Sequence, residues 1–210
     1  ISVSLPASHI ALCGPHTTVF SEQILSKYDF VNYILRGEYE YVLSDLVNHL
    51  DKNLPLSSVP GLVYRDSRKI KVNKSMPTIT NLDNLPWPER ESLPIFRYND
   101  GFCNLPQPNA QMWTSRGCPF ECVFCLWPQT IYGEHKYRKR NPRLVVDEME
   151  YLINKFNFKA IYFDDDVFNI DRNHVLEICK EIKERNMKIP WAVMARADFM
   201  DAELLKILAA

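Results

Sequence analysis

The sequence lacks the features of several common classes of protein. No run of about 18 apolar residues occurs, so no transmembrane helix is predicted, and no basic-then-apolar leader opens the chain. Its 25 Lys and Arg nearly balance 26 Asp and Glu, which argues against a general binder of nucleic acid or membrane surfaces. Six cysteines in 210 residues are too sparse for a disulfide framework. The composition is that of a soluble globular protein.

Three of the six cysteines are closely spaced. Cys118, Cys122 and Cys125 form a C-x3-C-x2-C pattern, with the aromatic Phe124 directly before the third. Three thiolates on one short loop can hold three irons of a 4Fe–4S cluster. The fourth iron then has no protein ligand, and an open metal position is a place for chemistry.

A zinc site is the first alternative for these cysteines. Structural zinc normally takes four ligands, often as two C-x2-C pairs. No second pair follows here, and no His lies within four residues of Cys125. Cys103 or His135 could still supply a distant fourth ligand. The spacing therefore favours a cluster and leaves zinc open.

Strands and helices alternate in two stretches of the sequence, which predicts an α/β fold with parallel strands. The stretch between them, at 53–108, is rich in Pro, and we expect it to be a linker that carries a β-hairpin near 61–72. After the linker, three βα units in a row fit the first half of a (β/α) barrel. The predicted strands lie at 9–14, 29–35, 111–115, 159–163 and 189–194, and the helices at 21–28, 37–50 and after the capping residues Asn141, Asp171 and Asp201.

The cysteine pattern resembles the signature of the radical S-adenosylmethionine (SAM) enzymes. Residues 118–130 and 137–140 resemble the branch that includes the anaerobic magnesium-protoporphyrin cyclases and the hopanoid-tailoring enzymes. Residues 11–18 and 31–40 resemble the last part of the cobalamin-binding domain of that branch. The resemblance covers most of the chain.

This resemblance implies an order of domains. Residues 1–52 would be the C-terminal part of a Rossmann-like cobalamin-binding domain, and 109–210 the N-terminal half of a radical SAM partial barrel. Because the chain starts at Ile1 and ends within a helix without a C-cap glycine, we expect a piece of a longer protein. The Asp-x-His-x-x-Gly loop of cobalamin domains is absent, and Cys13-Gly14 stands where the branch has Gly-Gly. Gly14 would still let the cobalamin tail approach the backbone.

The resemblance also implies ligands for SAM. The open iron binds its amino and carboxylate groups, and Phe124 would pack near its adenine. Asp165 and Asp166 stand where the superfamily often has Gly-Gly-Glu, and a carboxylate there can bind the SAM ammonium; the alternative is solvent exposure with helix capping. Arg196 could hold the SAM carboxylate or a substrate anion, or pair with Asp198.

The implied activity is reductive cleavage of SAM to a 5′-deoxyadenosyl radical, which abstracts hydrogen from a small-molecule substrate. Cobalamin could add methyl transfer, cyclisation or rearrangement. The implied partners are the substrate and an electron donor such as flavodoxin or ferredoxin, with no nucleic acid, in a reducing cytoplasm. The alternatives are a zinc- or Fe–S-bearing binding module and a tRNA methylthiotransferase. The latter class carries a second three-cysteine set upstream, whereas only Cys13 and Cys103 precede the motif.

Two further groups of residues are expected to be structural. Trp113 and Trp191 lie in predicted strands and should belong to the core. Five cations close to one another should mostly form a solvated face near a helix start: Lys136, Arg138, Lys139, Arg140 and Arg143.

Overall fold

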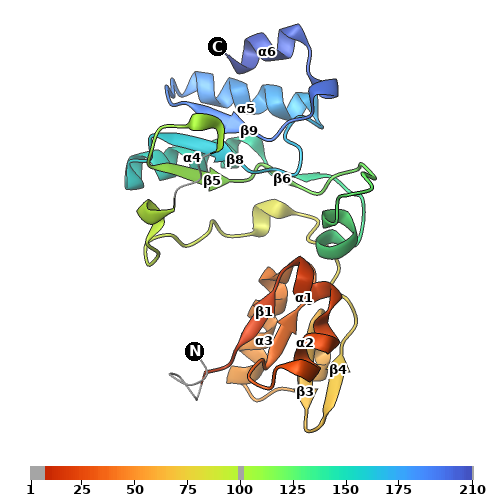
Figure 1. The fold of residues 1–210 in the computed structure, drawn as a ribbon. Coiled ribbons are helices and arrows are strands. Elements are labelled where there is room, and N and C mark those ends of the chain that lie inside the picture. Colours follow the sequence, from red (N-terminus) through yellow and green to blue (C-terminus); the bar gives the residue numbers. More distant parts are fainter. Residues whose placement is uncertain (1–7, 99–101, 210) are drawn as a thin grey trace. The chain divides into compact units, whose positions relative to one another are not determined.

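The computed structural model describes residues 8–98 and 102–209, and its contacts divide the chain into two compact units (Figure 1). Unit 1 contains the residues up to Ile79 together with Pro119–Lys136, and unit 2 contains Thr80–Cys118 and the residues from Tyr137 onward. The chain therefore passes from unit 1 to unit 2, returns, and crosses again. The cysteine motif lies at the second crossing, with Cys118 in unit 2 and the other two cysteines in unit 1.

Unit 1 is built on a four-stranded sheet in the order β1-β2-β3-β4. The first pair is parallel and the other two are antiparallel. The expected hairpin is confirmed as β3 and β4, and β3 also pairs with β2, so the hairpin extends the sheet. The strands are β1 (Ala11–Cys13), β2 (Tyr33–Leu35), β3 (Leu62–Asp66) and β4 (Lys69–Val72), and the helices are α1 (Pro15–Val19), α2 (Ser21–Lys27) and α3 (Tyr39–Asp51).

Helices cover both faces of this sheet because successive side chains of a strand point to opposite faces. In β2, Ile34 belongs to the cluster that contains Leu25 of α2. Its neighbour Leu35 belongs to the cluster that contains Val42 and Leu46 of α3. Two small cores, one on each face, hold the sheet between its helices.

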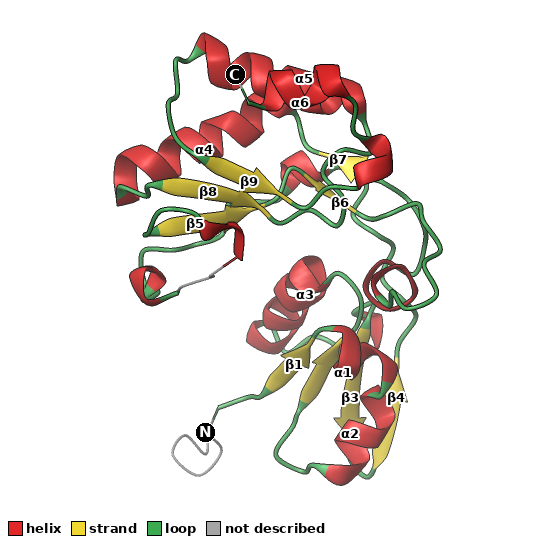
Figure 2. Ribbon diagram, turned by 45° about the horizontal axis from the view of Figure 1, so that its top comes forward, coloured by secondary structure: helices red, strands yellow, loops and turns green. Residues whose placement is uncertain are grey.

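Unit 2 contains three parallel strands in the order β5-β8-β9 (Figure 2). A separate two-stranded pair, β6 with β7, lies beyond their carboxyl ends. The predicted order of three successive strand–helix units is confirmed, although β5 ends at Met112 and not at residue 115. The elements are β5 (Asn109–Met112), β6 (Ser115–Arg116), β7 (Arg138–Lys139), α4 (Pro142–Phe156), β8 (Ala160–Phe163), α5 (Arg172–Glu184), β9 (Trp191–Val193) and α6 (Ala202–Leu208).

The helices of unit 2 begin where the sequence predicts. Each predicted capping residue accepts a hydrogen bond from a backbone N–H in the first turn, which satisfies a donor that the helix leaves open. The pairs are Asn141 with Arg143 at 3.0 Å, Asp171 with His174 at 3.1 Å and Asp201 with Leu204 at 2.7 Å. Helices α4 and α5 share one core with Ile161 and Phe163 of β8, so they cover the same face of the sheet.

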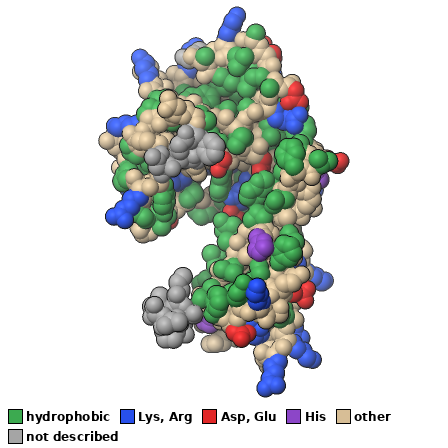
Figure 3. Space-filling model, viewed as in Figure 1, with side chains coloured by type: hydrophobic (Ala, Val, Ile, Leu, Met, Phe, Trp, Pro, Cys, Tyr) green, Lys and Arg blue, Asp and Glu red, His purple; other side chains and the backbone are tan. Residues whose placement is uncertain are grey.

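Loops and short helical turns connect these strands and helices. They include single 3₁₀ turns at Leu56–Ser58, Leu82–Asn84, Ile95–Arg97, Phe102–Asn104 and Ala197–Phe199, and one π-helical turn at Pro128–Tyr132. On the face drawn in Figure 3, Lys and Arg side chains are scattered over each unit. None of the helices in the described part of the chain has the length and apolar character needed to cross a lipid bilayer.

Candidate functional site

The carboxyl ends of the parallel strands of unit 2 carry most of the residues that the sequence singled out. Because β5, β8 and β9 are parallel, their carboxyl ends lie at one edge of the sheet. The loop to Cys118 follows β5, the three aspartates follow β8, and Arg196 follows β9. Active sites of (β/α) folds are built at this edge.

Asp165 is buried and points into the protein. Asp165 is 2% exposed. The carboxylate accepts hydrogen bonds from the Thr114 N–H, at 3.1 Å to each oxygen, from the Thr114 hydroxyl at 2.8 Å, and from the Ser115 hydroxyl. Burial raises the pKa of Asp165 to about 6, while these hydrogen bonds oppose the rise. Asp165 therefore fixes the two residues that lead from β5 toward the cysteines.

Asp166 holds the next part of the same loop. Its carboxylate accepts a hydrogen bond from the Gly117 N–H at 2.7 Å, directly before Cys118. Gly117 has a φ of 87°, a backbone conformation that residues with a Cβ rarely adopt. The two aspartates thus hold successive parts of the base of the cysteine loop, and their contact with a bound cofactor stays a prediction.

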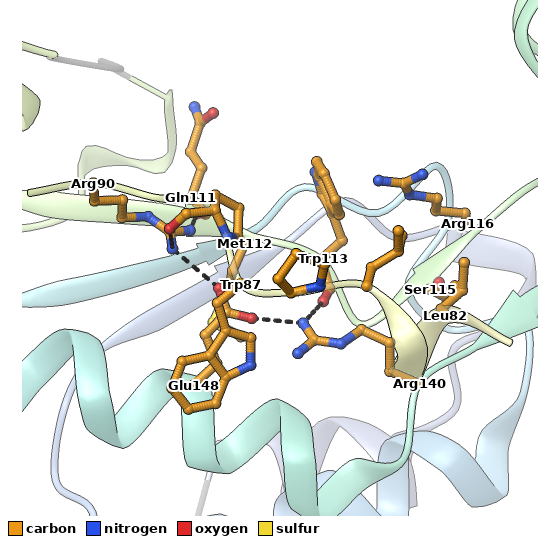
Figure 4. A pocket seen from close by; sticks show the side chains of 13 residues that line it. Leu82, Trp87, Arg90, Gln111, Met112, Trp113, Ser115, Arg116, Arg140 and Glu148 are labelled. Carbon is orange, nitrogen blue, oxygen red and sulfur yellow. Dashed lines mark hydrogen bonds and ion pairs between the residues drawn. The ribbon is translucent and has the colours of Figure 1, made fainter. Parts of the chain in front are cut away.

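Arg140 also fixes the loop base (Figure 4). Its backbone N–H donates to the Thr114 carbonyl at 2.9 Å, and its Nη1 donates to the Trp113 carbonyl at 2.8 Å. The same Nη1 pairs with Glu148 at 2.7 Å. Glu148 also accepts from Arg90 at 3.2 Å and is 1% exposed. One buried carboxylate therefore links α4 to the segment that carries Arg90 and to the start of the cysteine loop.

Replacement of Asp165 by asparagine is expected to remove a pH dependence of stability. The folded-state pKa of about 6 lies above the ordinary value of 3.8. Between these two pH values the folded chain therefore binds more protons than the unfolded chain. The free energy of unfolding should therefore fall as the pH rises from about 4 to about 6. Asp165→Asn keeps an accepting oxygen and does not titrate, so its stability should not show this fall.

Urea titrations of both chains across that pH range, followed by circular dichroism, check this prediction. Other titrating groups are shared by the two chains, so the difference between them isolates Asp165. An identical pH profile in the wild type and in Asp165→Asn would show that Asp165 does not titrate there.

The three motif cysteines are half-buried, and none of them forms a disulfide. Cys122 and Cys125 lie in one turn, in which the Cys125 N–H donates to the Cys122 carbonyl at 2.9 Å. Phe124 between them is 87% exposed. Within the described residues, no three His, Cys, Asp or Glu side chains are gathered closely enough to hold a metal ion. The donor set nevertheless fits a cluster with three thiolate ligands, because none of these thiols is consumed by a disulfide.

Arg196 pairs with its neighbour Asp198. The guanidinium donates to the Asp198 carboxylate through Nε at 3.0 Å and through Nη2 at 2.6 Å, so the pairing expected as one alternative is present. The backbone of Arg196 exchanges two hydrogen bonds with the side chain of Asn169, at 2.9 and 2.8 Å. Asn169 is 2% exposed and holds this position; the sequence analysis did not single it out. A role of Arg196 toward SAM stays a prediction.

Gly14 follows β1 at the carboxyl edge of the unit 1 sheet and precedes α1. Its φ is 106°, and a Cβ there would meet no atom within 4 Å. Its carbonyl accepts hydrogen bonds from the Thr18 N–H at 3.0 Å and the Thr17 hydroxyl at 3.1 Å. The backbone is therefore fixed with open space beside it, which fits the close approach of a cofactor.

Several buried or exposed side chains differ from the sequence-based expectation. Trp113 is 37% exposed, so its assignment to the core is wrong; β5 ends at Met112, and the Arg116 guanidinium lies 4.3 Å from the indole centroid. Lys136, Lys139 and Arg143 are exposed as expected. Arg138 is buried and Arg140 is partly buried, so the solvated face does not include them.

Glu148 and His174 are buried ionisable residues that the sequence analysis did not single out. Glu148 lies on the apolar stripe of α4, and a lone carboxylate on such a stripe is the signal that could have found it. His174 in α5 is fully buried, and burial lowers its pKa to about 4. It is therefore neutral above that pH.

The α/β fold and the cysteine loop resemble those of radical SAM enzymes, and comparisons with known proteins agree with this resemblance. No protein-family model matches the chain. It is 29% identical over 200 residues to an uncharacterised methyltransferase of Pyrococcus horikoshii. This alignment covers 95% of this chain and 42% of that protein. It is 29% identical over 220 residues to the anaerobic magnesium-protoporphyrin IX monomethyl ester cyclase of Cereibacter sphaeroides, with 96% and 33% covered.

Solved structures of TsrM, a radical SAM methyltransferase of Kitasatospora setae, share the fold. One contains cobalamin and a 4Fe–4S cluster, and aligns with a TM-score of 0.70 over 97% of this chain and 40% of TsrM. The other contains tryptophan and a SAM analogue, and aligns with a TM-score of 0.73 over 96% and 39%. Sequence identity to TsrM is 19%.

The chain is therefore similar in sequence to a methyltransferase and to a magnesium-protoporphyrin cyclase, and it shares the fold of a radical SAM methyltransferase. This confirms the resemblance drawn from the cysteine motif and the residues that follow it. The TsrM alignments also confirm the expected fold, a Rossmann-like part followed by part of a radical SAM core. The chain spans less than half the length of the curated relatives described here.

Proposed function

We propose that this chain is part of a radical SAM enzyme in which Cys118, Cys122 and Cys125 hold a 4Fe–4S cluster. One observation carries the proposal: three thiols in this spacing, none of them in a disulfide, follow the carboxyl end of a parallel strand, on a loop whose base is held by the buried Asp165 and the partly buried Asp166. Such a cluster, when bound with SAM at its open iron, supplies the electron that cleaves SAM to a 5′-deoxyadenosyl radical.

The residues of this chain have positioning roles in this proposal. Asp165 and Asp166 hold the loop base from β8, and Arg140 holds it from the start of α4. With the base fixed, only the segment that bears the cysteines has to close around the cluster, so less conformational entropy is lost on binding. Phe124 is exposed and is available to cover a bound SAM adenine.

The whole protein is proposed to use cobalamin as well. Gly14 offers a fixed backbone with open space at the edge of unit 1. The relatives include a protein named as a methyltransferase and a cyclase, so we propose methyl transfer or cyclisation on a small molecule. TsrM, which shares the fold, was solved with the small molecule tryptophan. A flavodoxin or ferredoxin is proposed as the electron donor, in a reducing cytoplasm.

Anaerobic reconstitution of the chain with iron and sulfide tests the cluster directly. The proposal predicts about four irons and about four sulfides per chain, with the broad visible absorption of a 4Fe–4S cluster. Stoichiometric zinc that iron and sulfide do not displace would contradict the proposal and favour a structural zinc module.

A further inference from the structure

A cavity of about 240 Å³ lies within unit 2 (Figure 4). Its walls come from three places: the segment 82–90, the end of β5 with the loop that follows, and the residues around the start of α4. Two indoles line it, those of Trp87 and Trp113, and they are 38% and 37% exposed. Large aromatic surfaces left open in a concave site favour a ligand with a flat ring.

The charges that line this cavity do not balance. The guanidinium groups of Arg90 and Arg140 line it against the single carboxylate of Glu148, and the Arg116 guanidinium, which packs on the Trp113 ring, lines it as well. Glu148 is almost fully buried between Arg90 and Arg140, at 3.2 and 2.7 Å. One carboxylate therefore neutralises only part of the positive charge, and the partly buried setting strengthens its attraction for an anion.

Arg140 has donors left for such an anion. Its hydrogen bonds to Trp113 and Glu148 both use Nη1. A guanidinium has five N–H donors, and within the described residues the Nε and Nη2 groups of Arg140 make no hydrogen bond. A planar guanidinium edge binds a carboxylate through two parallel hydrogen bonds, which a point charge cannot do.

We propose that this cavity binds a planar aromatic carboxylate, with its ring against the Trp87 indole and its carboxylate on Arg140. Trp113 has the Arg116 guanidinium 4.3 Å from its ring centroid, and Trp87 has the Tyr151 ring centroid at 5.1 Å. We assign the ligand ring to Trp87, because its neighbour is an uncharged ring and 38% of the residue is exposed. Glu148 lies beside Arg140 and repels a doubly charged group, which favours one carboxylate over a phosphate. The site lies entirely within unit 2, and its occupancy does not depend on the cluster or on SAM.

Calorimetric titration of the chain with indole-3-carboxylate tests the proposal. We expect binding with a stoichiometry of about one per chain, and at least about tenfold weaker binding of the uncharged indole-3-carboxamide, which has the same ring. Inorganic phosphate should not displace the acid. No binding of the acid, equal affinity for acid and amide, or displacement by phosphate at similar concentration would each overturn the proposal.

A pair of variants locates the site. Trp87→Leu removes the ring surface at a half-exposed position and should weaken binding of indole-3-carboxylate by about fivefold or more. Phe96→Leu is the matched control, because Phe96 is a 60% exposed aromatic residue close by in the sequence that does not line the cavity. The affinity of the Phe96→Leu chain for indole-3-carboxylate should equal that of the wild type. Unchanged binding by a folded Trp87→Leu chain would place the ligand elsewhere, and the comparison of acid with amide tests charge recognition without any variant.

Discussion

Replacement of Cys122 by alanine is expected to abolish cluster binding by this chain. A 4Fe–4S cluster with one open iron needs three thiolates, and Cys122 is the middle one of the motif. Its loss leaves two protein ligands on a short loop, which cannot retain the cubane during gel filtration. Iron and sulfide analysis after anaerobic reconstitution should give values near the background of a chain-free sample.

Cys103→Ala is the matched control for this experiment. Cys103 is an exposed free cysteine outside the motif, and its removal should leave the iron and sulfide content unchanged. Circular dichroism should show the same helix content for both variants, because Cys122 lies in a loop outside the helices and strands that the structure describes. Iron content in Cys122→Ala equal to that of the wild type would remove Cys122 from the ligand set, and loss in Cys103→Ala would add a ligand that the account does not contain.

Replacement of Glu148 by alanine is expected to destabilise unit 2 strongly. The Glu148 carboxylate is the shared partner of Arg90 and Arg140, whose side chains are 11% and 12% exposed. Removing one partner of a buried ion pair costs about 3–5 kcal/mol, because charged groups remain without compensation. Urea unfolding of Glu148→Ala should show a loss of that order relative to the wild type.

Glu150→Ala, on the same helix, separates this effect from a general change in α4. Glu150 is 48% exposed and pairs with Arg185 at 3.2 Å, and exposed pairs contribute about 1 kcal/mol or less. Its loss of stability should therefore be small. Equal effects of the two substitutions would show that the buried position of Glu148 has no special importance.

The sequence predicted helices and strands well where the interactions that form them join residues only a few positions apart. Asn141, Asp171 and Asp201 each cap a helix, because a short polar side chain bonds to the backbone within the same turn. The parallel arrangement of β5, β8 and β9 followed from the alternation of strand and helix.

The parts of the site that depend on distant residues were not predictable in this way. Arg140 lies in a run of cations that reads as a solvated face, yet Glu148 and the Trp113 carbonyl draw its guanidinium inward. Asp165 reads as a strand-end carboxylate open to a cofactor, whereas Thr114 and Ser115, some fifty positions away, enclose it. Such contacts join segments far apart in sequence, and no pattern of neighbouring residues encodes them.

The most direct test of the central claim is electron paramagnetic resonance of the reduced, reconstituted chain with and without SAM. Chelation of SAM by an open iron changes the electronic environment of the cluster, so the account predicts a 4Fe–4S signal whose shape shifts when SAM is added. A cluster signal that stays the same at saturating SAM, or a chain that holds zinc and gives no signal, would contradict the claim.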